Sequence, residues 1–384
     1  MFSPAAAVII VPNARNKIYI GKRVPFAETE PAKDKPYEVS RIMKNFAIAV
    51  DLGGTNLRIA AVDEQGNLVE KVTLGTEVSL GRDRVIDDMC GAIEQLSAKY
   101  KGSATLLGIG IGVPGIIDMQ TGLLRESPNL PGWADYPVRA EIERRLKTVV
   151  ILENDANVAA LGEKWLGAGR EFDDMAMLTL GTGVGGGLVL RGSIWHGMNG
   201  MAGEWGHSNV EPEGHPCGCG SRGCLEQYAS ATAMLRMAKE AAAANPSSTL
   251  AHAAKDPAFS SKSVYDLAMQ GDEDARKVFH CVGRALGIVL SGMVNGLNLP
   301  MYVIGGGASS AWDAFAPAIF EEVRWRSMVY GATAPADSLA LGKRVSVQLA
   351  SGLRFKTIVT RAQLGTDAGL IGAARLPMIP EAMR

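Results

Sequence analysis

Short apolar runs separated by glycine-rich turns organise most of the chain. Each run is four to eight residues long, which is typical of a buried β-strand. These predicted strands are 46–50, 106–113, 149–152, 175–180 and 301–304. Apolar residues at helical spacing predict helices over 85–100, 157–166, 229–244 and 272–290. Because predicted strands alternate with predicted helices, we expect an α/β fold.

The first 43 residues differ from the rest of the chain. Five prolines interrupt them and no amphipathic period survives, so they are predicted to form a poorly ordered extension, 1–43. Met43 directly precedes the first predicted strand, and translation could equally begin there. A chain of 384 residues favours more than one domain. We expect a small α/β lobe over 44–156, a large one over 157–365, and a C-terminal helix over 366–376 that packs back on the small lobe.

Composition narrows the class of protein. Hydrophobic residues make up 47% and charged residues 21% of the chain, the balance of an ordinary globular protein. The net charge of -1 provides no global positive field, which argues against nucleic-acid or membrane partners. We find no apolar run approaching the roughly 20 residues that span a bilayer. The expectation is a cytoplasmic protein that acts on a small molecule.

Three glycine-rich breaks each follow a predicted strand: Gly53-Gly54-Thr55, Gly181-Thr182-Gly183 and Gly305-Gly306-Gly307. Glycine lets the backbone approach an anion closely and turn its N–H groups toward it. Any one of these breaks alone is more simply a tight turn, but three together favour phosphate binding. None of the three has the Walker pattern or a Rossmann glycine pattern opening a helix.

Asp155 lies between the predicted strand 149–152 and the helix predicted from 157. An aspartate in this position can cap the helix N-terminus. It can also accept the proton of an attacking hydroxyl, a recurring role for carboxylates in phosphoryl transfer. Its neighbours form the segment Glu153-Asn154-Asp155-Ala156-Asn157. This segment resembles one of a known family, which favours Asp155 as a proton acceptor.

Three cysteines, Cys217, Cys219 and Cys224, lie within eight positions of one another, too close for an extended disulfide framework. With one histidine they supply four N/S ligands, which suit a closed tetrahedral zinc site. His207 and His215 are both candidates for the imidazole. Gly218, Gly220 and Gly223 are predicted to let the chain wrap around the ion.

Glu204 and Glu226 flank the zinc ligands, so fixing the metal would also fix both carboxylates. The phosphate turns lie on other segments of the chain. A zinc knuckle unrelated to chemistry is the alternative. Cys90 and Cys281 stand apart in helix-like stretches and are predicted to be buried structural thiols.

Several of these motifs resemble known families. DLGGTN at 51–56, LGTGVGGG at 180–187 and IGGG at 304–307 resemble the two phosphate segments and the adenosine segment of the actin, hexokinase and heat-shock chaperone superfamily. That resemblance implies two ribonuclease-H-like lobes that close on ATP. ENDAN at 153–157 is similar to a sugar-kinase segment. LGTGVGGGLVLRGSIWHGMNGMAGEWGH and CGCGSRGCLE resemble the signature and the zinc motif of the ROK family, over roughly 44–375.

The resemblance implies an ATP-dependent kinase for the 6-hydroxyl of glucose, with Asp155 as general base, Asp51 organising Mg²⁺ through water, a structural Zn²⁺ and a homodimer. The metal ligands it favours are His207, Cys217, Cys219 and Cys224. The hexose-binding residues it implies are Asn129, Asn154, Asp155, Glu204, His207 and Glu226. The nucleotide-binding residues it implies are Asp51, Gly53, Gly54, Thr55, Asn56, Gly181, Thr182, Gly183, Gly305, Gly306 and Gly307.

Other functions remain open within this family. Fructose, mannose, N-acetylmannosamine and N-acetylglucosamine are alternative acceptors, and polyphosphate is an alternative donor. ROK proteins also include sugar-responsive transcriptional regulators, which carry a helix-turn-helix before the lobes. Residues 1–43 are too short and proline-broken for one, and the phosphate segment from Asp51 is intact. A non-catalytic sugar receptor would be expected to lack Asp155.

Overall fold

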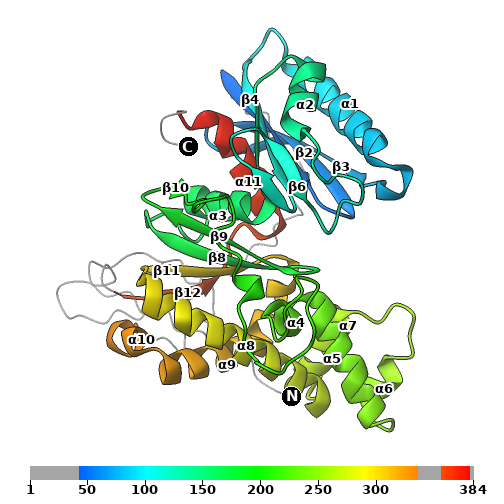
Figure 1. Cartoon of the computed structure of the whole chain (residues 1–384), viewed down its shortest axis with the longest axis vertical. Coiled ribbons are helices and arrows are strands. Elements are labelled where there is room, and N and C mark those ends of the chain that lie inside the picture. Colours follow the sequence, from blue (N-terminus) through cyan, green and yellow to red (C-terminus); the bar gives the residue numbers. More distant parts are fainter. Residues whose placement is uncertain (1–42, 336–355, 381–384) are drawn as a thin grey trace, which may run out of the picture. The chain divides into compact units, whose positions relative to one another are not determined.

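The computed structural model describes residues 43–335 and 356–380 (Figure 1). The predicted extension 1–43 lies outside these residues, apart from Met43 itself. The described chain forms two five-stranded sheets, and we name them by their strand order. Sheet A has the order β3-β2-β1-β4-β7 and sheet B the order β10-β9-β8-β11-β12.

Both sheets follow the same topology. In each, the first three strands form antiparallel hairpins, and two parallel strands then extend the sheet beyond the first strand. The strands of sheet A are β1 (Asn45–Leu52), β2 (Asn56–Asp63), β3 (Leu68–Gly75), β4 (Thr105–Val113) and β7 (Val150–Asn154). Those of sheet B are β8 (Met175–Leu180), β9 (Val184–Leu190), β10 (Ser193–Ile194), β11 (Met301–Gly305) and β12 (Ile358–Arg361). A small hairpin joins β5 (Ile116–Asp118) to β6 (Leu123–Glu126).

Helices cover both faces of sheet A. Alternate residues of a strand point to opposite faces, and β1 shows this clearly. Ile48 and Val50 belong to the core formed with α1 (Arg82–Tyr100) and α2 (Val138–Leu146). Ala47 and Ala49 belong to a different core, formed with α3 (Asp155–Leu166) and α11 (Ala368–Arg375).

Sheet B is also covered on both faces. Leu178 and Tyr302 face the largest core, to which α5, α8 and α9 contribute (Figure 1). Met177 and Val303 face the other side, where they pack with residues of α3. The helices of this half are α4 (Glu226–Ala229), α5 (Ala231–Ala244), α6 (Thr249–Ala253), α7 (Ser261–Gln270), α8 (Glu273–Leu297), α9 (Trp312–Arg326) and α10 (Met328–Thr333).

Helix α3 therefore packs on both sheets. Val158 and Leu161 enter the core of sheet A with α11, whereas Ala159 and Ala160 enter the core of sheet B. The C-terminal helix α11 contacts α3, β1 and β4. The two lobes predicted from the sequence thus share α3, and the predicted boundary between residues 156 and 157, which falls within this helix, remains a proposal.

Glycines bring α3 and α11 unusually close together. A Cβ atom on Gly372 would lie 1.6 Å from the carbonyl oxygen of Val158, and one on Gly162 would lie 2.3 Å from that of Ala368. No side chain fits at either position unless the two helices separate. The backbone contact of α3 with α11 therefore depends on two residues without side chains.

Several element boundaries differ from those predicted. β7 continues to Asn154, and α3 begins at Asp155 rather than near 157, because the backbone turns helical directly after the cap. α8 runs to Leu297, and by length and composition it could cross a membrane, which corrects the expectation that no run approaches that length. The most apolar stretch of α8 is 67% buried, so in the described part of the chain α8 is a core helix that packs on sheet B.

We predict that Gly372→Ala destabilises the protein by about 3 kcal/mol, the range for overpacking, since the new methyl group clashes with a backbone carbonyl. Gly292→Ala is the matched control. Gly292 lies within α8, and a Cβ there meets no atom within 4 Å. The control should gain up to about 1 kcal/mol from helix propensity. Urea unfolding measures both changes, and equal stabilities of the two variants would contradict the close packing of α3 on α11.

Candidate active site

The carboxyl-terminal ends of three parallel strands of sheet A place several acidic residues in one row. In register, Asp51 of β1 faces Gly112 of β4, and Gly112 faces Glu153 of β7. Neighbouring strands lie about 4.8 Å apart, so this edge carries Asp51 and Glu153 within about 10 Å. The turn to Asn154 and Asp155 follows directly.

The first predicted phosphate turn connects β1 to β2. Its backbone is closed by a hydrogen bond from Gly53 N–H to the Asn56 carbonyl, 2.9 Å, and Thr76 donates its hydroxyl to the Gly53 carbonyl at 2.7 Å. Thr55 and Asn56 are exposed. Gly54 lies against Asn129, where an added Cβ would be 3.2 Å from the carbonyl oxygen. The structure thus brings the predicted sugar residue Asn129, which is exposed, beside this turn.

The second and third predicted turns lie side by side on sheet B. They follow β8 and β11, which are neighbouring parallel strands. Gly306 has a φ of 79°, and an added Cβ would lie only 2.4 Å from the Leu180 carbonyl oxygen. Gly181 N–H donates to the Gly183 carbonyl at 2.9 Å, which closes the second turn. Thr182 and Gly307 are exposed.

Asn154, not Asp155, caps α3. The Asn154 Oδ1 accepts from the backbone N–H groups of Ala156 and Asn157, at 2.9 and 3.2 Å. The alternative in which Asp155 is the cap is therefore wrong. Asn154 Nδ2 donates to the Gly115 carbonyl at 3.2 Å, so one of its N–H groups remains for a ligand.

Asp155 occupies the first position of α3 and is partly buried. Its Oδ1 accepts from the Ala156 N–H at 2.8 Å. Burial, together with the charges of Asp51 and Glu204, raises the pKa of Asp155 to about 6, although the hydrogen bond from the Ala156 N–H opposes this shift. A carboxyl with such a pKa is mostly ionised at neutral pH but still has appreciable basicity, which suits a general base.

Asp51 is buried and forms an ion pair with Arg58 of the neighbouring strand β2. Arg58 also donates to the Thr366 carbonyl at 2.6 Å, which ties the start of the C-terminal segment to this edge. Burial raises the pKa of Asp51, and the Arg58 charge opposes this effect. Arg58 was not predicted as a site residue. Only the alternation of residues between the two faces of β2 could have indicated which side of the sheet it lies on.

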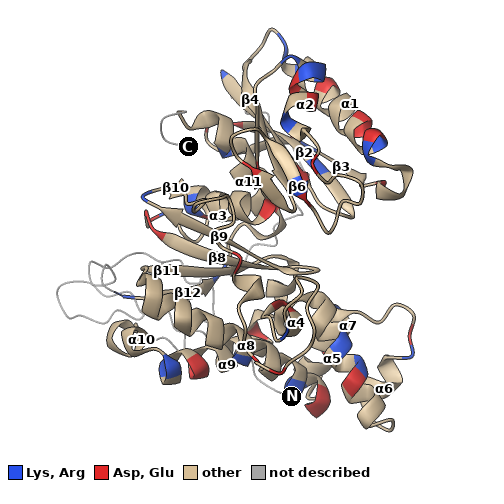
Figure 2. Cartoon of the chain, in the orientation of Figure 1, with Lys and Arg blue, Asp and Glu red and all other residues tan. Residues whose placement is uncertain are grey.

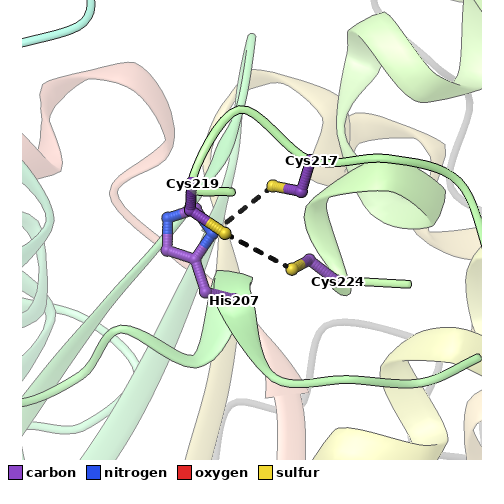
Figure 3. A group of neighbouring side chains, drawn as sticks. All are labelled: His207, Cys217, Cys219 and Cys224. Atoms are coloured by element: carbon purple, nitrogen blue, oxygen red, sulfur yellow. Dashed lines mark hydrogen bonds between the residues drawn. The ribbon is translucent and has the colours of Figure 1, made fainter. Parts of the chain in front are cut away.

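The cysteine and histidine cluster is assembled as predicted. One ligand atom from each of four residues lies within 4.8 Å of the others, namely His207, Cys217, Cys219 and Cys224 (Figure 3). The Nδ1 of His207 lies 3.7 Å from the Cys217 Sγ, and the Cys219 and Cys224 sulfurs are also 3.7 Å apart. His215 is not part of the cluster, and its Nδ1 lies 3.0 Å from the Pro216 carbonyl.

The backbone around the cluster needs two of its three glycines. Gly220 and Gly223 have φ values of 89° and 69°, in the left-handed region that favours glycine. Gly218 does not share this conformation, and a Cβ there meets no atom within 4 Å. Of the three glycines predicted to let the chain wrap around the ion, Gly220 and Gly223 therefore have a conformation that favours glycine and Gly218 does not.

Both flanking glutamates connect the cluster to the predicted substrate residues. The Nε2 of His207 faces Glu204, 3.9 Å from its Oε2. The Oε2 of Glu226, at the start of α4, accepts from the Val184 N–H at 3.0 Å. Val184 directly follows the second turn, so the zinc segment contacts this turn although the two lie on different segments of the chain, as expected.

The chain belongs to the ROK family. The model of that family matches residues 47–378. This membership confirms two α/β lobes of the actin and hexokinase type, consistent with the repeated sheet topology described above.

Three relatives are informative. A glucokinase of Halalkalibacterium halodurans is 39% identical over 332 residues, which cover 86% of this chain and 94% of that protein. The ROK glucokinase of Streptomyces griseus, solved with glucose and AMPPNP, is 32% identical with a TM-score of 0.69, covering 86% of this chain and 98% of the other. A xylose repressor of Caldicellulosiruptor bescii is 29% identical over 73% of this chain and 71% of that protein.

Proposed function

We propose that this chain is an ATP-dependent hexose kinase that phosphorylates the 6-hydroxyl of glucose. Similarity to glucokinases over most of their length supports the substrate class. The observation that carries the proposal is Asp155, a carboxylate freed from capping by Asn154 and surrounded by acidic groups that raise its proton affinity. A regulator or a sugar receptor has no need for an uncapped carboxylate with a raised proton affinity.

In the proposed reaction, the sugar hydroxyl transfers its proton to Asp155 as its oxygen bonds to the γ-phosphorus of ATP. The bond from that phosphorus to the β,γ-bridging oxygen breaks, and ADP leaves. Glucose 6-phosphate and a protonated Asp155 remain, and the carboxyl then releases its proton to water. Holding the hydroxyl in line with the phosphorus is the main task of the protein in such transfers.

The nucleotide is proposed to lie along the glycine turns. Backbone N–H groups of the turns at 53–56 and 181–183 bind its phosphates, with hydroxyls from Thr55 and Thr182, whereas Gly305–Gly307 faces the adenosine. Asp51 is proposed to hold Mg²⁺ through water, and its ion pair with Arg58 leaves one carboxylate oxygen for this task. When bound, Mg²⁺ would neutralise charge on the phosphates.

The sugar is proposed to contact the exposed Asn129, the free N–H of Asn154, and Glu204 and Glu226 beside the metal cluster. Zn²⁺ fits the three thiols and the imidazole, and with four protein ligands it would be structural. With Nδ1 of His207 on the metal, Nε2 would face Glu204 and the sugar. The metal would therefore fix the sugar-binding carboxylates.

Another hexose as substrate and a regulatory role are the competing functions. In the described residues, α1 carries both acidic and basic side chains, with ion pairs such as Arg84–Asp88, which does not favour a nucleic-acid surface (Figure 2). A coupled ADP-release assay over glucose, fructose, mannose and the two N-acetylated amino sugars decides between acceptors. Replacing ATP with polyphosphate tests the donor. No phosphorylation of any sugar would exclude the kinase function.

The family resemblance also supports a homodimer in the cytoplasm. Light scattering of the purified protein tests the dimer, and fractionation of cells tests its location. A monomeric protein with full activity would contradict the first of these proposals.

We predict that Asp155→Asn lowers turnover by at least about a hundredfold, because an amide cannot accept the proton. Its amide oxygen can still accept from the Ala156 N–H, so glucose affinity should change by less than about tenfold. Isothermal titration and steady-state assays measure both quantities. Asp313→Asn, at an exposed position of α9, is the control and should keep wild-type activity. Near-wild-type turnover of Asp155→Asn would exclude Asp155 as the base.

The pH dependence of kcat/KM for glucose should follow the protonation of Asp155. The base works only when ionised, so activity should be constant above its pKa and fall about tenfold per unit below an apparent pKa near 6. A cation beside Asp51 would cancel part of the charge that raises this pKa, so saturating Mg²⁺ should move the inflection to lower pH. A flat profile between pH 5 and 8 would contradict this assignment.

Loss of the metal should raise the KM for glucose more than the KM for ATP. We predict that Cys219→Ala protein lacks zinc and shows a KM for glucose raised by more than about tenfold, because Glu204 and the His207 ring lose their support. The KM for ATP should rise less, through the Glu226 contact with Val184. Cys281→Ala, a thiol outside the cluster, is the control and should keep its zinc. Zinc-free protein with unchanged glucose kinetics would refute the coupling.

A further inference from the structure

His196 forms a short contact between the two sheets that the proposed mechanism does not use. Its Nε2 lies 2.7 Å from the Oε2 of Glu153. Glu153 is the second-last residue of β7 in sheet A, directly before Asn154 and Asp155, whereas His196 follows β10 of sheet B. The two residues are 43 positions apart in the chain.

The carboxylate of Glu153 is almost completely buried, with 3% of its side chain exposed. Its Oε1 accepts from the Asn154 N–H at 2.9 Å and from Asn157 Nδ2 at 3.0 Å. Its Oε2 faces His196. A buried carboxylate that loses a partner is strongly unfavourable, so the structure makes Glu153 dependent on His196. The hydrogen bond to Glu153 raises the pKa of His196 above its ordinary value.

His196 also begins the loop that leads to Glu204. The His196 carbonyl accepts from the Ala202 N–H at 3.1 Å, which closes the loop at its base. Gly200 lies against the small β5–β6 hairpin, where an added Cβ would be 2.9 Å from the Ile117 carbonyl oxygen. At the other end, Gly203 packs on β9, with an added Cβ only 2.6 Å from the Gly186 carbonyl oxygen. Glu204 follows immediately.

We propose that His196 is a positioning residue that, through Glu153, fixes the catalytic turn at Asn154–Asp155 relative to the sugar-binding loop ending at Glu204. This inference rests on the proposed kinase function. Asn154 is tied to the pair through its own N–H, and Asn157 through its side chain, so the first turn of α3 is held on two sides. The loop is held by the same residue, whose backbone carbonyl accepts from the Ala202 N–H.

The test compares three substitutions of His196. Glutamine places its amide nitrogen near the position of the imidazole Nε2, whereas asparagine reaches only the position of Nδ1, and alanine removes the donor. We expect His196→Ala and His196→Asn to lower kcat/KM for glucose at least about twentyfold, with the KM for ATP changed by less than about threefold. His196→Gln should stay within about threefold of wild type. Equal activities of the Gln and Asn variants would overturn the proposal, even if the Ala variant fails to fold.

A second substitution tests whether His196 acts through Glu153. In the His196→Ala background the buried carboxylate lacks a partner, and Glu153→Gln removes its charge while retaining Oε1 as an acceptor. The double variant should therefore be at least about threefold more active than His196→Ala, although Glu153→Gln alone gives no gain over wild type. If the activity losses of the two single variants simply multiply in the double variant, the two residues act independently, and the proposed action of His196 through Glu153 is refuted.

Hydrogen exchange separates this inference from the kinase function. In the unliganded protein, backbone amides of 196–204 and of Asn154 should exchange faster in the Ala and Asn variants than in wild type, but not in the Gln variant. Unchanged exchange would overturn the positioning role whether or not the protein phosphorylates a sugar. If wild-type protein phosphorylates none of the sugars tested, while exchange follows this pattern, the kinase proposal fails and the anchoring role stands.

Discussion

The tight packing of α3 between the two sheets is the constraint on which the rest of the molecule depends. On one side Gly372 allows α11 to touch its backbone, and on the other Gly187 allows β9 to do so, since an added Cβ there would lie 2.9 Å from the Ala156 carbonyl oxygen. Close-packed interiors transmit small displacements rather than absorb them. Because Asp155 is the first residue of α3, the position of the proposed base is set by contacts with both sheets.

Buried carboxylates secure α3 at both ends. Glu153 precedes the helix and accepts from its first turn. Glu163, in the last turn and fully buried, accepts from the backbone N–H groups of Ala168, Gln363 and Leu364, at 2.8, 3.1 and 2.7 Å. A buried charge is tolerated when such donors surround it. The second of these anchors ties α3 to the segment that leads into α11, so the same helix holds the C-terminal part of the chain.

The proposed chemistry follows from how charge is distributed around this helix. Asp51 lies in sheet A and Glu204 in the loop after β10, and both raise the proton affinity of Asp155. Arg58 partly neutralises Asp51, which would leave a site able to accept a hydrated cation. In this scheme the metal is structural and does not act on the reacting groups. Its contribution is to hold Glu204 through His207 and Glu226 through the chain after Cys224, and Glu226 in turn touches the second phosphate turn.

The order of strands, glycine turns and helices could be predicted from residues that are neighbours in the chain, because hydrophobic period and turn chemistry act over short distances. The same holds for the Cys217, Cys219 and Cys224 ligands, whose spacing allows one ion. Tertiary packing decided the rest: Asn154 rather than Asp155 caps α3, Arg58 pairs with Asp51 across the β1–β2 hairpin, and His196 partners Glu153 from 43 positions away. Each depends on which groups become buried together. Burial brings together residues such as Arg58 and Thr366, 308 positions apart, and no local pattern encodes such a pairing.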